Sequence, residues 1–290
     1  MKSLLVPTDF SLESHHAYAV ALQIAQQTHG TVTLLHVLEP LPMPPAGFSG
    51  MSGMMSGVDI PVAPNGIGLP TINELMNNAK HRLLELKQES TGLAPGVWVQ
   101  CLVEVGRVGE GILAAVQQLG IDLVVMGAQG HSALEGIFIG SNTEWLIRQA
   151  PCPVLTVKHA QARFEVHNIV FASDFAEKSA TAADGFHHIA AAFPKAMVHL
   201  LYIRTDDDDE PAATHYIEEF AEHAQLANYT IVMASASSPA VGIEQFAKQV
   251  KANLVVIPTH ARSGLSRFFH PSVAEAVAIH ALPPVLTYHV

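Results

Sequence analysis

Short runs of apolar residues alternate along this chain with longer stretches in which apolar residues recur every three or four positions. The short runs predict strands, whereas the spaced pattern predicts amphipathic helices. In the first half, strands are predicted at residues 2–6, 31–37, 97–104, 122–126 and 153–157. Helices are predicted between them at residues 12–29, 72–91, 108–119 and 142–149. Strands that alternate with helices favour a parallel sheet with crossover helices.

The second half of the chain repeats the first. Residues 6–11 (Val-Pro-Thr-Asp-Phe-Ser) are echoed by residues 171–176, and residues 122–158 align without gaps on residues 253–289, with 13 identities in 37 positions. The second copy predicts strands near residues 168–172, 197–203, 229–233, 253–257 and 284–288. We therefore expect two tandem α/β domains, residues 1–160 and 161–290, each a five-stranded open parallel sheet with helices on both faces.

One segment has no counterpart in the second copy. The offset between equivalent residues falls from 165 at Asp9 and Asp174 to 131 at Asp122 and Asn253, so the first copy carries 34 extra residues. They map near residues 41–72, a run rich in Gly, Pro and Met that predicts a loop. The methionines could also form an adaptable apolar surface that covers a ligand or docks a partner.

Composition narrows the class of protein. The chain has 290 residues, with 15 Lys and Arg against 26 Asp and Glu, and the net charge of −11 disfavours binding to nucleic acid or to anionic membranes. The apolar run at residues 4–6 is too short for a signal peptide, so we expect none there, and no apolar run is long enough to span a membrane. The two cysteines make no disulfide framework, so we expect a cytoplasmic protein. The 17 histidines are scattered, and we expect no metal site.

The candidate chemistry lies in residues 126–144, between a predicted strand and a predicted helix. Gly127, Gly130 and Gly140 leave no Cβ and allow positive φ, so successive N–H groups can turn toward an anion. The helix that opens near Ser141 adds unpaired N–H groups and a favourable dipole, with the hydroxyls of Ser141 and Thr143 as further donors. Ser141 and Glu144 also fit a capping box. The spacing alone leaves phosphate binding and a structural role open.

The glycine spacing resembles the signature G-x2-G-x9-G-S/T of the universal stress proteins. Residues 6–11, the Leu-Leu-His-Val run at 34–37, the Leu-Val-Val-Met-Gly run at 123–127 and residues 150–157 also look like that family. The resemblance implies a Rossmann-like fold of the adenine-nucleotide α-hydrolase type, and binding of ATP, ADP or AMP with or without Mg²⁺. It implies that the last strands of the two copies pair as an intramolecular pseudo-dimer, which leaves a further homodimer open.

The resemblance also implies which residues of the first copy meet the nucleotide. At the ends of the first two strands, the adenine wall would be formed by Pro7, Thr8, Asp9 and Val37. At the glycine loop, the ribose and the phosphate tail would lie on Met126, Gly127, Gly130, Gly140, Ser141, Asn142 and Thr143. Asp9 has a structural alternative, because an acid that follows a strand often caps the next helix. Gln129 and Asn142 depart from the usual residues of the family, but neither change removes a main-chain donor.

The second copy departs from the signature at all three glycine positions, which hold Pro258, Ala261 and Pro271. Proline has no N–H and alanine resists positive φ, so we expect no phosphate site in this copy. One nucleotide site is therefore predicted per chain, in the first half.

The glycine loop carries no P-loop lysine, basic finger or metal-binding acid of the kind that phosphoryl transfer needs. We therefore assign no catalytic residue, and the resemblance implies a nucleotide-binding protein with a stress-response or signalling role. A slow ATPase or phosphotransferase is one alternative. Another is an adaptor in which the second copy and the Met/Gly-rich loop bind a protein or an apolar ligand.

Overall fold

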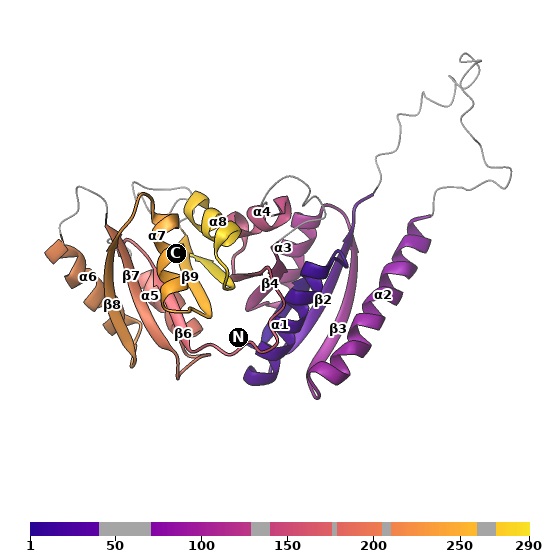
Figure 1. Ribbon diagram of the computed structural model, residues 1–290. Helices are drawn as coiled ribbons and strands as arrows, with labels where there is room; N and C mark the ends of the chain where they lie inside the picture. The colour runs from indigo at the N-terminus through magenta and orange to yellow at the C-terminus, as the bar shows by residue number, and fades with distance from the viewer. Residues whose placement is uncertain (41–70, 129–139, 176–178, 205–209, 260–270) are drawn as a thin grey trace, which may run out of the picture.

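The two copies share one continuous sheet. A computed structural model describes residues 1–40, 71–128, 140–175, 179–204, 210–259 and 271–290, and places the copies side by side (Figure 1). The strands are β1 (Ser3–Pro7), β2 (Thr31–Leu38), β3 (Trp98–Val105), β4 (Leu123–Gly127), β5 (Val154–Val157), β6 (Asn168–Ala172), β7 (Met197–Arg204), β8 (Tyr229–Ser235), β9 (Leu254–Thr259) and β10 (Val285–His289). Every strand predicted from the apolar runs is present, within two residues at each end.

The strand order is β3-β2-β1-β4-β5-β10-β9-β6-β7-β8. Neighbouring strands are parallel within each copy, and β5 pairs antiparallel with β10, with Leu155 opposite Leu286. The expected pairing of the last strands is therefore observed, and it merges the two predicted five-stranded sheets into one ten-stranded sheet. In each copy the strand order reverses beside the first strand, and open α/β sheets bind ligands at that point.

Helices cover both faces of the sheet. They are α1 (Leu12–Thr28), α2 (Ile72–Leu93), α3 (Val108–Leu119), α4 (Ser141–Gln149), α5 (Ser179–Ala190), α6 (Glu210–His223), α7 (Pro239–Gln249) and α8 (Pro271–His280). On one face, α1, α2, α5 and α6 bury a single apolar cluster that runs through both copies. On the other face, α3 and α4 cover the first copy while α7 and α8 cover the second. Strands buried on both faces explain the nearly continuous apolar runs in the sequence.

The turn that follows the first strand has the same geometry in both copies. Phe10 has φ 64° and its equivalent Phe175 has φ 49°, an unusual conformation for residues other than glycine. The backbone N–H of Phe10 donates to Thr8 Oγ1 at 3.0 Å, and that of Phe175 donates to Ser173 Oγ at 2.9 Å. Side-chain oxygens thus hold both turns, and the sequence repeat corresponds to a structural repeat.

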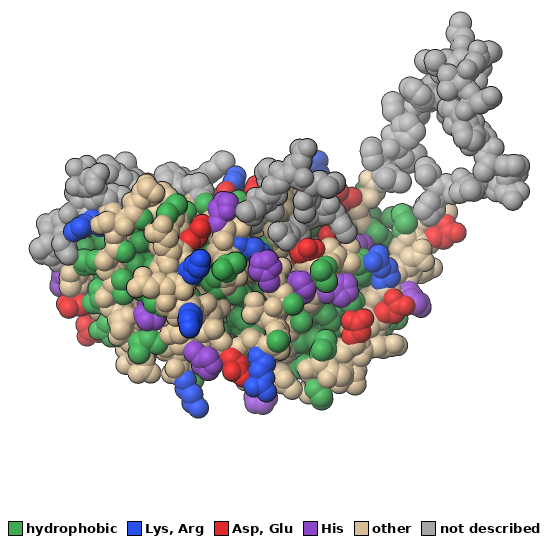
Figure 2. Space-filling view, viewed as in Figure 1, with side chains coloured by type: hydrophobic (Ala, Val, Ile, Leu, Met, Phe, Trp, Pro, Cys, Tyr) green, Lys and Arg blue, Asp and Glu red, His purple; other side chains and the backbone are tan. Residues whose placement is uncertain are grey.

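The surface carries charges of both signs. Figure 2 shows acidic and basic side chains interspersed over one face of the molecule. In the described part of the chain, no helix is both long and apolar enough to cross a membrane. Among the same residues, no three His, Cys, Asp or Glu side chains lie close enough together to hold a metal ion.

Charged side chains connect the copies beside the β5–β10 pair, where α4 packs against α8 (Figure 1). Arg148 of α4 makes a bidentate ion pair with Glu275 of α8, in which Nη2 lies 2.9 Å from Oε2. Lys158, which is buried, donates from Nζ to the carbonyl oxygen of Ile279 at 2.7 Å. Burial lowers the pKa of Lys158 to about 8, although the nearby Glu244 carboxylate opposes this shift. Protonation of the Lys158 amine in the folded protein therefore costs free energy.

We expect Lys158→Met to show this cost as a pH-dependent difference in stability. Below pH 8 the amine is charged in both the folded and the unfolded state, so the wild type bears the full burial penalty. Between pH 8 and 10.5 only the unfolded chain still holds the proton, so the penalty disappears. Relative to the variant, the wild type should gain about 2 kcal/mol of unfolding free energy between pH 7 and 10.5. Urea denaturation of both proteins at both pH values measures the gain, and a constant difference would contradict it.

Candidate functional site

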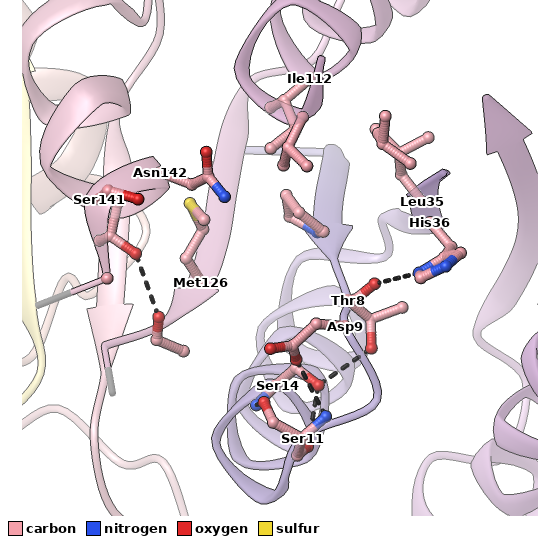
Figure 3. A pocket seen from close by; sticks show the side chains of 16 residues that line it. Thr8, Asp9, Ser11, Ser14, Leu35, His36, Ile112, Met126, Ser141 and Asn142 are labelled. Atoms are coloured by element: carbon pink, nitrogen blue, oxygen red, sulfur yellow. Dashed lines mark hydrogen bonds between the residues drawn. The ribbon is translucent and has the colours of Figure 1, made fainter. Parts of the chain in front are cut away.

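A cavity of about 340 Å³ opens at the carboxyl ends of β1, β2 and β4 in the first copy. Its described lining is Pro7, Thr8, Asp9, Ser11, Ser14, Leu35, His36, Val37, Val108, Ile112, Met126, Gly127, Gly140, Ser141, Asn142 and Thr143. Figure 3 shows Ser141 and Asn142 across the cavity from His36, with Met126 and Ile112 between them. Ten of the residues predicted to meet a nucleotide thus lie around one cavity. The eleventh, Gly130, lies outside the described residues.

The floor of the cavity is a hydrogen-bonded turn between β1 and α1. The backbone N–H of Thr8 donates to the Leu35 carbonyl at 2.8 Å, and the hydroxyls of Thr8 and Ser14 lie 2.9 Å apart. Ser11, rather than Asp9, is the N-cap of α1, because its side chain accepts the N–H of Ser14. The first strand is therefore joined to the next strand and to the following helix by buried polar groups that satisfy one another.

Asp9 is exposed at this turn, and its Oδ1 accepts the N–H of Ser11 at 2.9 Å. Partial burial would raise the pKa of the Asp9 carboxyl, but hydrogen bonds from Ser11 outweigh it and lower the pKa below its ordinary value. Asp9 therefore presents a fixed negative charge at neutral pH. A carboxylate in this position accepts hydrogen bonds from a ligand and repels anions.

Gly127 is required by helix packing rather than by backbone conformation. A Cβ on Gly127 would lie 2.7 Å from the carbonyl carbon of Glu13 in α1, which is too close for any side chain. The positive φ that glycine allows is used neither here nor at Gly140, where φ is −59°. The sequence could not show this, because the approaching helix is remote from Gly127 along the chain.

Gly140 is the N-cap of α4 and stands beside the cavity. A Cβ on it would meet nothing closer than Thr143 Oγ1 at 4.0 Å, so the space in front of Gly140 is open. The N–H groups of Thr143 and Glu144 bond back to the Gly140 carbonyl. Ser141 is the first helical residue and not the cap, so the capping box proposed for Ser141 and Glu144 is wrong.

The first turn of α4 offers donors to an anion in the cavity. Ser141 and Asn142 are exposed, and their N–H groups are among those that a helix leaves unpaired at its start. Thr143 is different, since it is only 3% exposed and its hydroxyl donates to the Gly127 carbonyl at 3.3 Å. Of the two hydroxyls expected to serve as donors, that of Ser141 faces the cavity and that of Thr143 ties α4 to β4.

Several lining residues were missed by the sequence analysis. Leu35 and His36 lie beside the predicted Val37, and the Nδ1 atom of His36 lies 2.7 Å from the Thr8 carbonyl. The Phe10 ring contacts His36 in a tilted arrangement, with ring centroids 4.6 Å apart, and the Arg82 guanidinium lies 3.9 Å from the centre of the Phe10 ring. The echoed Leu-Leu-His-Val run is a signal that could have found His36. Ser11, Ser14, Val108 and Ile112 carry no such signal, because their distance from the cavity depends on packing.

In the second copy the equivalent space is filled. The residues at the corresponding positions enclose about 10 Å³. Ile203, Ile257 and Val273 stand there in place of Val37, Met126 and Asn142. The Cδ1 atom of Ile203 lies 2.7 Å from where a Cβ on Gly242 would be, so its extra methylene reaches the backbone of α7. Pro258 lies in β9 and Pro271 begins α8, while Ala261 lies outside the described residues.

Comparison with known proteins agrees with this architecture. A universal stress protein of Thermus aquaticus is 28% identical over 157 residues, 54% of this chain and 98% of the relative. One from Methanocaldococcus jannaschii is 29% identical over 157 residues, 54% of this chain and 94% of the relative. The crystal structure of a universal stress protein from Archaeoglobus fulgidus has the same fold, with a TM-score of 0.72, 18% identity, and coverage of 99% of this chain and 98% of that one.

The family model of the universal stress proteins matches three segments, residues 1–56, 67–158 and 165–289. These segments span both copies and nearly the whole chain. The chain therefore belongs to the universal stress protein family.

Proposed function

We propose that the first copy binds one adenine nucleotide, ATP, ADP or AMP, in the cavity at the ends of β1, β2 and β4. The observation that carries the proposal is the contrast between the two copies, which have the same arrangement of strands and helices. The volume of the cavity is about 340 Å³ in the first copy and about 10 Å³ in the second. Val37, Met126 and Ile112 give the open cavity an apolar wall against which a purine ring can pack.

In the proposed complex, the base and ribose lie toward Asp9 and the phosphates lie toward α4. The Asp9 carboxylate would accept hydrogen bonds from amino or hydroxyl groups of the ligand. The N–H groups of Ser141 and Asn142, the Ser141 hydroxyl and the helix dipole would hold the phosphates. Neither lysine nor arginine occurs among the described lining residues, so these neutral donors carry the phosphate contacts there. The proposal is accordingly one of binding, with no reaction assigned and with Mg²⁺ as an optional companion of the phosphates.

We further propose that nucleotide occupancy serves a stress response or a signalling pathway in the cytoplasm. Family membership supports the role in stress. A nucleotide that binds only the folded chain would also stabilise it by mass action. The joined last strands support the view that one chain acts as a pseudo-dimer with a single nucleotide site.

Gly140→Val should weaken ATP binding at least tenfold without unfolding the protein. The Gly140 backbone has φ −59° and open space beside it, so valine fits the fold but its side chain enters the volume proposed for the phosphates. The loss of a glycine N-cap changes stability by about 0.5 kcal/mol. Isothermal titration calorimetry with ATP, together with urea denaturation, separates the two effects.

Gly127→Ala, a substitution at another glycine of the cavity, is the variant to compare with Gly140→Val in that experiment. Its added Cβ would overlap the backbone of Glu13, so it should cost about 1–3 kcal/mol of unfolding free energy. If Gly140→Val leaves the ATP affinity unchanged, the proposed phosphate site is incorrect.

The double variant Val37→Ile with Met126→Ile gives the first cavity the aliphatic wall of the second copy. The double variant adds one methylene at residue 37 and a branch at Cβ of residue 126, and we expect this change of shape to reduce the ATP affinity about tenfold or more, because it removes room for the base. The reciprocal variant, Ile203→Val with Ile257→Met, alters the second copy by the same atoms and should leave the affinity unchanged. Calorimetry should give one ATP per chain for the wild type. A second site, or equal effects of the two variants, would contradict the assignment to the first copy.

A further inference from the structure

The segment that links the two copies is seated in a groove beside α1. The amide of Gln23 binds it at two points, donating to the Gln161 carbonyl at 3.3 Å and accepting the Phe164 N–H at 2.6 Å. The Gln27 amide donates to the Phe164 carbonyl at 3.1 Å. The side chain of Phe164 is 3% exposed and packs edge-on against Phe193, with ring centroids 6.1 Å apart. The linker is thus held by two glutamine amides and one buried aromatic ring.

The pairing of β5 with β10 creates an equivalent groove on the other side of the junction, beside α5. The repeat offset of 165 relates Gln23 to His188 of α5 and Gln27 to Ala192, which lies two residues beyond the end of α5, and both line that groove. The backbone at the start of the strand beside each groove is also held in the same way. Asp122 Oδ2 accepts the N–H groups of residues 2 and 3, at 2.6 and 3.0 Å. Asn253 Oδ1 accepts those of residues 167 and 168, at 2.9 and 3.0 Å. The two grooves are therefore related by the internal repeat.

The groove beside α5 encloses about 620 Å³, and no described segment of this chain lies in it as the linker does in its counterpart. In this groove Thr28 has the position that Phe193 has beside the linker. Because threonine is smaller than phenylalanine, the place that receives an aromatic ring is wider here. One wall is the ring of Tyr288, whose hydroxyl donates to the Ala182 carbonyl at 2.6 Å. Gly185 allows that close approach, because a Cβ on it would lie 2.5 Å from the Tyr288 ring. Met1 and Lys2 border the groove, and the amino terminus lies at the junction of the copies in Figure 1.

We propose that this groove binds an extended peptide segment of a partner protein through one large aromatic side chain, in the way the linker occupies the equivalent groove. The ring would enter the space between Thr28 and Ile189, against Tyr288. His188, at the Gln23 position, is exposed and can exchange a hydrogen bond with the peptide backbone. Aromatic anchors in a pocket carry much of the affinity of such contacts, while the backbone bonds set the register.

The peptide His-Ala-Gln-Ala-Arg-Phe-Glu-Val, which copies residues 159–166, is the natural probe. Labelled with a fluorophore, it should bind the full-length protein in an anisotropy titration, and the version with alanine in place of phenylalanine should lose that binding. Ala192→Gln restores the amide that Gln27 supplies in the linker groove and should tighten binding about three- to tenfold. His188→Ala should weaken binding by a similar factor, and Ala192→Trp should abolish it by filling the groove.

His223→Ala is the matched control, since His223 is an exposed histidine near the end of α6 that bonds only within its own helix among the described contacts. It should leave the peptide affinity unchanged.

A second experiment tethers the segment to the protein, because a tethered segment has a higher effective concentration than a free peptide. In this variant, residues 159–165 are copied directly before Met1. Its Tm should rise above that of a protein whose extension has alanine in place of phenylalanine. The proposal is overturned if the free peptide and the tethered segment both behave like their alanine versions, or if the Ala192 variants have no effect in either form.

Discussion

The antiparallel pairing of β5 with β10 is the interaction on which the rest of the structure depends. Each copy alone would end in an exposed strand edge, and the pairing removes both edges at once. It also sets α4 against α8, where the Arg148–Glu275 ion pair forms, and it creates the two equivalent grooves at the junction. Glu275 is only 8% exposed, so its charge needs the guanidinium of the other copy.

The two copies show that few side chains separate an open cavity from a packed core in the same architecture. The turn after the first strand, the strand order and the helix positions are the same, and even Ile112 has its counterpart in Ile243. What differs on the cavity wall is three side chains, since Ile203, Ile257 and Val273 replace Val37, Met126 and Asn142. In a close-packed interior such side chains fill the space that a ligand would need. Copy two thus has the same architecture without the open cavity, and its α8 packs against α4 of copy one.

The junction between the copies shows the same kind of asymmetry, at the edge of the sheet opposite the cavity. One groove is occupied by the linker, which the chain needs in order to pass from β5 to β6. Its equivalent has the smaller side chains of Ala192 and Thr28 at the positions of Gln27 and Phe193. An internal repeat presents two copies of each surface, but a single linker can occupy only one of them. The open cavity of the first copy and the open groove beside α5 are therefore both consequences of a symmetric frame whose two halves have been filled differently.

The sequence by itself determined the repeat and all ten strands to within two residues, because period and repeat offset are local or one-dimensional signals. The pairing of the last strands and ten residues of the cavity followed from the resemblance of its motifs to the universal stress proteins. The sequence did not determine why Gly127 is a glycine, that Gly140 rather than Ser141 caps α4, or that the Thr143 hydroxyl is already bonded. Those depend on which atoms of remote segments come within contact distance. The closed cavity of the second copy and the open groove beside α5 were likewise decided by tertiary structure alone, since volume exists only between packed elements.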